Sequence, residues 1–225
     1  MTRRARLYFS FRSPYSWLTV RRLRAAVPDA FDALDWLPYW DPDGTTAGLL
    51  AERGVDLHYG QMSRSKHRYI LLDTKRLATA DGAAMAWPVD VDPWWEPAHL
   101  AWLWARRSGR AEPFYDAVTA ARWERGENIS DPAVVAACAA QAGLDPDVAA
   151  ACADDPELRA EGVECLSHAY HDDVFGVPYL KLGHHRFWGY DRLDVFLATW
   201  PRPTEPPSPP PVTTAYDADT AGGCG

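Results

Sequence analysis

A short apolar run that breaks at a proline and continues as a helix constrains the fold of this chain more than any other segment. Residues 5–11 are rich in Leu, Tyr and Phe, which favours a β-strand. Ser13 then precedes Pro14, a typical helix start, and we expect that helix to reach about Ala26. A second strand is predicted over 34–39. The order strand, helix, strand suits a parallel pair joined by a crossover.

The middle of the chain, from about 45 to 172, consists almost entirely of helical patterns. EPAHLAWLWARRSG and AEPFYDAVTAARWERG, for example, carry periodic apolar residues and end in a basic turn followed by glycine. Two short strands are then predicted over 178–182 and 186–188, with a final helix over 191–200. We therefore expect residues 1–44 and 173–200 to form one α/β unit, with 45–172 as an all-helical insertion.

Residues 201–225, PRPTEPPSPPPVTTAYDADTAGGCG, form a proline-rich tail without periodic apolar residues. This composition predicts a disordered or extended segment, either loose or docked on a proline-binding partner.

Charge and hydropathy exclude two classes of partner. The net charge of −8 argues against nucleic acid, whose phosphates require a basic face. No apolar run reaches the roughly 18 residues of a membrane span. The apolar part of MTRRARLYFSF is too short for a signal peptide, so a cytoplasmic location is expected.

The cysteines and histidines form no recognisable metal or redox motif. Cysteines stand at 138, 152, 165 and 224, without a C-x-x-C pair. Cys138 and Cys152 lie in alanine-rich helical segments, where cysteine is typically a small buried apolar residue. His168 with His171 and the pair at 184–185 lack a strict metal-binding motif, so no metal is expected.

Two segments resemble those of one known family. FSFRSPYSWL resembles the strand-to-helix entry of 2-hydroxychromene-2-carboxylate isomerases and kappa-class glutathione transferases. VFGVPYLKLGHHRFWGYDRLD looks like their Phe-Gly-Val-Pro segment followed by Phe-Trp-Gly-x-Asp-Arg-Leu. Between these segments the family's order is also followed by Lys66, Tyr69, Asp73, Arg76 and Trp87-Pro88. The resemblance covers about residues 5–200 and implies an α/β, thioredoxin-like fold with an all-helical insertion, as in DsbA-like proteins.

Ser13-Pro14-Tyr15-Ser16 occupies the spacing of a Cys-Pro-Tyr-Cys redox pair. A hydroxyl cannot form a disulfide, so thiol–disulfide exchange through this motif is excluded. The first turn of a helix still offers free N–H groups and a positive dipole end, which stabilise a thiolate. The resemblance implies that this thiolate belongs to a bound small thiol and that Ser13 is the catalytic residue that activates it. From the residues alone, Ser13 is equally an ordinary N-cap.

The resemblance also implies a binding site for the thiol. Val177-Pro178 resembles the family's cis-proline step, whose backbone pairs with the peptide-like part of the cofactor; from the residues alone, Pro178 could simply begin a strand. Tyr190 and Asp191 match the positions that hold the γ-glutamyl end of glutathione, although Asp191 could instead be an N-cap. Relatives more often carry Asn, Gln or Ser where Tyr190 stands, so glutathione and another low-molecular-weight thiol, such as mycothiol, both remain candidates.

Two features suggest substrate contacts. Lys66, Asp73 and Arg76 lie near one face of a predicted helix, which is either a solvated charged face or places Lys66 to bind a substrate carboxylate or phenolate. WPVDVDPWWEP is rich in tryptophan, and Trp87, Trp94 and Trp95 could form the wall of an aromatic site.

The resemblance implies a thiol-dependent cis-trans isomerase acting on an aromatic or polyketide-like substrate. Two alternatives stay open: a kappa-like thiol S-transferase that stops after addition, and a non-catalytic DsbA-like protein that binds a ligand. Relatives are often dimeric, so a homodimer is a further expectation.

Overall fold

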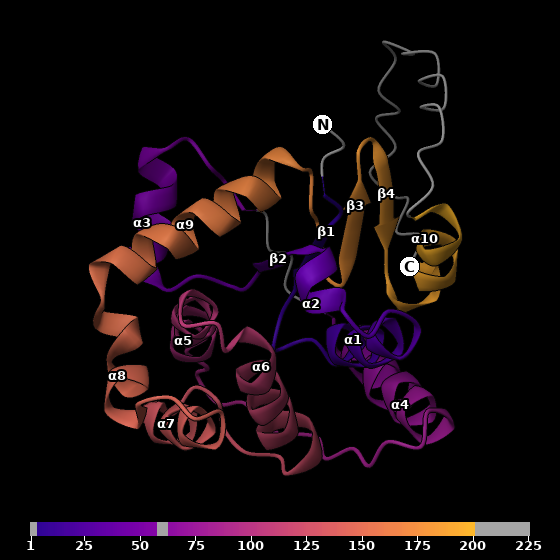
Figure 1. Ribbon diagram of the computed structural model, residues 1–225, viewed down its shortest axis with the longest axis horizontal. Coiled ribbons are helices and arrows are strands. Elements are labelled where there is room, and N and C mark those ends of the chain that lie inside the picture. The colour runs from indigo at the N-terminus through magenta and orange to yellow at the C-terminus, as the bar shows by residue number, and fades with distance from the viewer. Residues whose placement is uncertain (1–3, 58–62, 201–225) are drawn as a thin grey trace.

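Four strands form one mixed sheet in the computed structural model, which describes residues 4–57 and 63–200 (Figure 1). The strands are β1 (Arg6–Phe9), β2 (Asp35–Pro38), β3 (Tyr179–Leu182) and β4 (His185–Trp188), in the spatial order β2-β1-β3-β4. β1 pairs parallel with β2, as predicted, whereas β3 pairs antiparallel with β1 and β4. The predicted tail lies outside the described residues.

Helices occupy the chain between and after these strands. They are α1 (Pro14–Ala26), α2 (Ala30–Ala33), α3 (Gly44–Glu52), α4 (Arg64–Ala80), α5 (Glu96–Arg107), α6 (Ala111–Thr119), α7 (Pro132–Gln141), α8 (Pro146–Ala151), α9 (Pro156–His171) and α10 (Leu193–Thr199). A π-helical turn, Ala120–Glu124, continues α6, and a 3₁₀ turn, Cys152–Asp154, follows α8. The final helix begins two residues later than predicted, because Tyr190–Arg192 forms another 3₁₀ turn before α10.

Local capping explains where most of these helices begin. Ser13 caps α1 and Ser63 caps α4, and each side chain accepts a hydrogen bond from the backbone N–H three residues later. Asp131, Asp145 and Asp155 cap α7, α8 and α9, each accepting from the backbone N–H two residues later, and each precedes a proline at the first helical position. These starts are encoded locally, which is why the sequence pattern predicts them.

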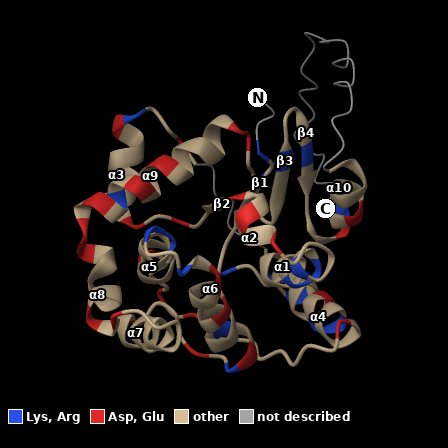
Figure 2. Cartoon of the chain, viewed as in Figure 1, with Lys and Arg blue, Asp and Glu red and all other residues tan. Residues whose placement is uncertain are grey.

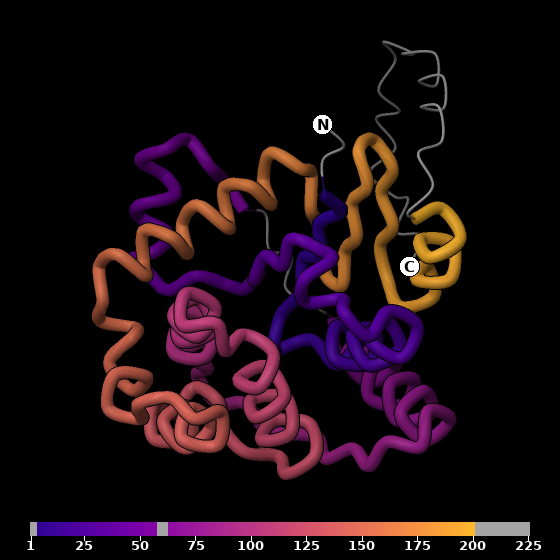
Figure 3. The backbone as a smooth tube through the Cα atoms, in the orientation of Figure 1, coloured from indigo at the N-terminus to yellow at the C-terminus, as the bar shows by residue number. Residues whose placement is uncertain are grey.

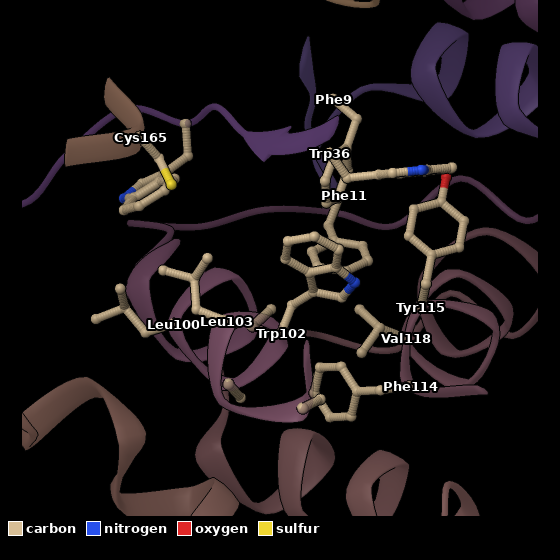
Figure 4. Packing of buried hydrophobic residues seen from close by; sticks show 14 of the residues in the cluster. Phe9, Phe11, Trp36, Leu100, Trp102, Leu103, Phe114, Tyr115, Val118 and Cys165 are labelled. Atoms are coloured by element: carbon tan, nitrogen blue, oxygen red, sulfur yellow. The ribbon is translucent and has the colours of Figure 1, made fainter. Parts of the chain in front are cut away.

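The two faces of the sheet contact different helices. Leu7 and Phe9 of β1 belong to the main core, together with Val20 of α1 and Phe196 of α10. Figure 4 shows Trp102 of α5 at the centre of this packing, and its ring centroid lies 5.0 Å from that of Phe9. The core therefore joins the sheet directly to the helical block.

Tyr8 belongs to a second cluster, which contains Ala169 of α9 and Tyr179 of β3. Its hydroxyl donates to Asp172 Oδ2 at 2.6 Å, and Arg6 donates to the same oxygen at 2.7 Å. Lys181 of β3 pairs with the other oxygen of this carboxylate. These hydrogen bonds hold the pKa of Asp172 at about 2 against the opposing effect of burial. The carboxylate thus ties the end of α9 to β1 and β3.

α4 lies beside α1 at the outside of the molecule, as the tube in Figure 3 makes clear. Only Thr74 and Ala78 of α4 are buried. Lys and Arg residues are spread along α1 and α4, whereas Asp and Glu residues prevail along α8 and α9 (Figure 2). The pair α1 and α4 is therefore the more basic part of a chain that is acidic as a whole.

The cysteines within the described residues are buried. Burial raises the pKa of Cys138 to about 11 and that of Cys152 and Cys165 to about 12. This confirms Cys138 and Cys152 as buried apolar residues. Within residues 4–57 and 63–200, no helix is long and apolar enough to cross a membrane, and no three or more His, Cys, Asp or Glu residues are grouped so that they could hold a metal ion.

Candidate active site

The two motifs singled out in the sequence meet at the N-terminus of α1. Ser13 Oγ accepts from the Ser16 N–H at 3.1 Å and donates to the Val177 carbonyl at 3.3 Å, across a separation of 164 residues. The Val177–Pro178 bond is cis, as predicted. Ser13 is a true N-cap, but it is only partly buried, so its hydroxyl lies where a ligand can reach it.

Buried side chains fix the loop before α1 through hydrogen bonds to its backbone. His99 of α5 donates from Nδ1 to the Trp95 carbonyl at 2.7 Å, which leaves Nε2 to accept from the Phe11 N–H at 3.2 Å. The Trp123 indole N–H donates to the Phe11 carbonyl at 3.1 Å. Burial lowers the pKa of His99 to about 3, so the ring is neutral at physiological pH. The position of Ser13 is therefore fixed by fully buried hydrogen bonds.

Ser16 has a structural role. Its side chain is buried, and Oγ accepts from the Ser10 N–H at 3.3 Å. The second position of the Ser-x-x-Ser motif thus braces the loop and does not face a ligand.

Several donors remain at the helix tip. Pro14 has no N–H, and the Tyr15 N–H finds no hydrogen-bond partner within residues 4–57 and 63–200. The Val177 N–H is likewise without a partner there. Together with the Ser13 hydroxyl, these groups form a donor set suited to a sulfur anion attached to a peptide-like chain.

The Tyr190-Asp191 segment lies next to the cis-proline loop. The Gly189 N–H donates to the Pro178 carbonyl at 3.0 Å, and Gly189 has a φ of 101°, a conformation that favours glycine. The Tyr190 hydroxyl donates to Asp81 at 3.2 Å, so this side chain packs toward the end of α4. Asp191 is exposed and caps neither the 3₁₀ turn nor α10, which removes the N-cap interpretation.

A cavity of about 490 Å³ lies beside Arg12, the residue before Ser13. Its walls come from α4, from the loop between α4 and α5, and from the turn that follows α6. Trp87 and Trp95 line it, together with Ile70 and Leu71. The aromatic and apolar lining is typical of a site for a flat organic ligand.

Charged residues in this cavity occur as two ion pairs. Arg12 pairs with Asp41. Arg122 donates to both oxygens of Asp90, at 2.9 and 2.8 Å. Arg122 is only 2% exposed and its guanidinium carbon lies 4.9 Å from the Trp95 ring centroid. Burial raises the pKa of Asp41, and the Arg12 charge partly offsets that rise.

Sequence reasoning missed this charged part of the site. The sequence pattern indicates Arg122 only as part of a basic helix end. In the structure this residue lies in the π-helical turn and is buried. π-Helical turns are frequent at functional sites, but no sequence pattern here announces one.

The predicted substrate residues are separated by the structure. Trp87 lines the cavity, whereas Trp94 does not, because its indole N–H donates to Asp43 at 3.1 Å on the side of α3. Trp95, its neighbour, lines the cavity in its place. Lys66 is exposed in the first turn of α4, and the adjacent His67 is the residue of that turn that reaches the cavity.

Asp73 and Arg76, which share α4 with Lys66, form an ion pair at 2.9 Å. Asp73 also accepts from the Tyr15 hydroxyl at 2.8 Å. These contacts fasten α4 to the first turn of α1, so Asp73 supports the site structurally.

Comparisons with known proteins agree with this architecture. Residues 6–199 match the family model of DSBA-like thioredoxin domains. A 2-hydroxychromene-2-carboxylate isomerase from Sphingobium xenophagum is 27% identical over 205 residues, covering 89% of this chain and 98% of the relative.

Two solved structures share the fold. A 2-hydroxychromene-2-carboxylate isomerase superposes with a TM-score of 0.68 at 21% identity, covering 87% of this chain and 93% of the other. A probable DsbA oxidoreductase from Streptomyces coelicolor gives a TM-score of 0.64 at 19% identity, covering 91% and 92%.

Proposed function

Because the chain belongs to the family of DSBA-like thioredoxin domains, we propose that it is an enzyme of that fold that uses a borrowed small thiol to isomerise an aromatic or polyketide-like substrate. Its relatives support an enzyme of the isomerase or oxidoreductase type. The thiol, glutathione or a compound such as mycothiol, would act as the cofactor.

The serine at the tip of α1 is the observation that carries this choice. A disulfide oxidoreductase of this fold needs a sulfur where Ser13 stands, and a hydroxyl cannot exchange disulfides. The cysteines at 138, 152 and 165 are buried with raised pKa values, so none of them offers a reactive thiolate. The tip keeps the donors of a thiolate site and lacks the thiol.

The donor set suits an absent thiol and defines what each residue would do. When bound, the thiol supplies a sulfur nucleophile that adds to a conjugated double bond, allows rotation about it and is then expelled. The Ser13 hydroxyl would turn from the Val177 carbonyl to donate to the sulfur, while the Tyr15 N–H and the helix dipole favour its anionic form. Val177 would pair with the peptide-like backbone, and Asp191 would accept from a cationic end group.

The cavity beside Arg12 would hold the acceptor substrate. Trp87 and Trp95 offer flat apolar surfaces to an aromatic ring and exclude water around it. Because Arg12 directly precedes Ser13, a ring bound in this cavity would lie next to the helix tip. Positioning of this kind contributes to catalysis because it removes the entropy of bringing two reactants together.

The test compares Ser13→Ala with Ser63→Ala. Both variants lose the N-cap side chain of a helix, so the cost in folding stability is similar, about 1 kcal/mol each. With 2-hydroxychromene-2-carboxylate or a neutral cis-configured hydroxyaryl enone as substrate, and either glutathione or mycothiol as thiol, Ser13→Ala should lower kcat by about 10²–10³, as expected for removing one donor to a developing anion. Ser63→Ala should leave kcat unchanged. Full turnover by Ser13→Ala, or no turnover of either compound by the wild type with either thiol, would overturn the proposal.

A further inference from the structure

The cavity beside the helix tip neutralises both of its arginines with its own carboxylates. We propose that this cavity selects a neutral, flat aromatic ligand that carries hydroxyl groups, and discriminates against an aromatic carboxylate. This inference rests on the proposed function, because it takes the cavity to be the substrate site.

The first ion pair joins Asp41 to Arg12, the residue directly before Ser13. The side chains of Arg12 and Asp41 remain 25% and 31% exposed, so both reach the cavity surface. Their charges cancel at short range. A ligand carboxylate that approached Arg12 would also approach Asp41, and the repulsion between the two anions would offset the attraction.

The second ion pair is held by several contacts within the protein. Both terminal nitrogens of Arg122 donate to Asp90, and the guanidinium lies between the rings of Trp95 and Trp123, at 4.9 and 4.7 Å from their centroids. Planar bidentate pairing of this kind is the geometry in which arginine would otherwise hold a ligand carboxylate. Because Asp90 already occupies it, an anionic ligand would have to displace Asp90 from this pairing.

The carboxylates, unlike the guanidinium of Arg122, retain free surface. Asp90 is 27% exposed although Arg122 is almost fully buried. A carboxylate has about four acceptor positions, and Arg122 uses two of those on Asp90. Asp41 and Asp90 therefore offer acceptors to the cavity, and these match hydroxyl donors on a ligand.

The remaining walls favour a flat ring. Trp87 and Trp95 lie on the lining with Pro88 and Pro93. The volume of about 490 Å³ falls in the range of small-molecule sites, roughly 300–1,000 Å³. Two or three fused rings with phenolic hydroxyls fit this combination of shape, apolar surface and acceptors.

Calorimetric titration of the wild-type protein without any thiol tests the inference. Three probes share one ring system: a naphthalenediol, the matching hydroxynaphthoate and the dimethyl ether of the diol. The diol should bind about tenfold more tightly than the naphthoate, which carries the repelled charge, and more tightly than the ether, which lacks donors. Equal or tighter binding of the naphthoate would overturn the inference, as would equal binding of diol and ether.

The variant Asp41→Asn provides a second test, with Asp116→Asn as its matched control. Asp116 pairs with Arg24 and does not line the cavity, so both variants remove one negative charge from an arginine pair. Asp41→Asn should tighten naphthoate binding about tenfold while Asp116→Asn leaves it unchanged. Equal changes in naphthoate affinity in both variants would contradict a local effect of the Asp41 charge. The wild-type comparison decides the question even if Asp41→Asn fails to fold.

Failure here is distinguishable from failure of the proposed function. The titrations contain no thiol and leave Ser13 intact, so they report on the cavity alone. If Ser13→Ala loses turnover while the wild type binds the naphthoate more tightly than the diol, the proposed isomerase function stands and the proposed charge selection is wrong.

Discussion

A cysteine placed at the tip of α1 would measure directly how well this site holds a sulfur anion. In Ser13→Cys the new sulfur takes the N-cap position, where the Ser16 N–H already donates at 3.1 Å to Ser13 Oγ. A hydrogen bond to a charged group contributes about 1.5–3 kcal/mol. The dipole of α1 adds about 1 kcal/mol. Together, about 3 kcal/mol corresponds to a pKa roughly two units below the ordinary value of about 8.5.

The assay is the rate of alkylation by iodoacetamide as a function of pH, in a Cys224→Ser background. The three cysteines of α7, the turn after α8 and α9 are buried with raised pKa values and stay silent near neutral pH. Ser108→Cys is the control, because Ser108 is exposed at the C-terminal end of α5, where the dipole opposes an anion. We expect a midpoint near 6.5 for Ser13→Cys. A midpoint at or above that of Ser108→Cys would refute the reasoning.

Three further perturbations test the scaffold. Gly162→Ala should destabilise the protein by about 1–3 kcal/mol in urea unfolding, because the added Cβ would lie 2.8 Å from Leu100 and 2.9 Å from Trp40. Asp172→Asn should cost about 3 kcal/mol in the same assay, because Arg6 and Lys181 lose their shared partner. The depressed pKa of buried His99, about 3, means that the unfolded chain binds more protons below about pH 6.5; stability should therefore fall as pH drops below that value, by up to about 1.4 kcal/mol per pH unit in thermal or urea unfolding.

Two of these perturbations have a matched reference variant. Gly48→Ala, in α3 with nothing within 4 Å of the new Cβ, should be stabilising by about 0.5–1 kcal/mol, and an equal loss in both glycine variants would contradict the packing argument. His99→Gln keeps a donor and an acceptor but does not titrate, so its stability should change little between about pH 6.5 and 5. The Asp172 carboxylate, with its depressed pKa of about 2, keeps its contribution above about 3.8 and loses it only as pH falls toward 2. An unchanged slope in His99→Gln would assign the loss to other groups.

The parts of the fold that could be predicted from sequence are those with local causes. Helix starts such as Ser13-Pro14 and Asp155-Pro156 depend on residues within one turn, and the structure has helices starting at both. Strand ends depend on which backbone groups find a hydrogen-bond partner on a neighbouring strand. The predicted first strand stops at Phe9, because the Ser10 carbonyl accepts from the Ser13 N–H in the turn that leads into α1.

The cavity could not be predicted, because its polar parts are tertiary. Arg122 is buried through Asp90, 32 residues earlier, and through two indole rings. Trp94 and Trp95 are adjacent in sequence but face different neighbours, as successive residues at a helix start must. A tryptophan-rich segment predicts an aromatic wall without stating which of its rings forms it.

The strand order has a consequence for how the chain folds during its synthesis. β1, at the N-terminus, pairs with β2 after a short interval, but its other side is covered only by β3, which begins at Tyr179. A nascent chain that has emerged as far as α9 therefore exposes a row of unpaired backbone groups along β1. Such an edge attracts strands from other molecules. Chaperone binding to ribosome-stalled fragments should thus persist through α9 and end once the β3–β4 hairpin is free to close the sheet.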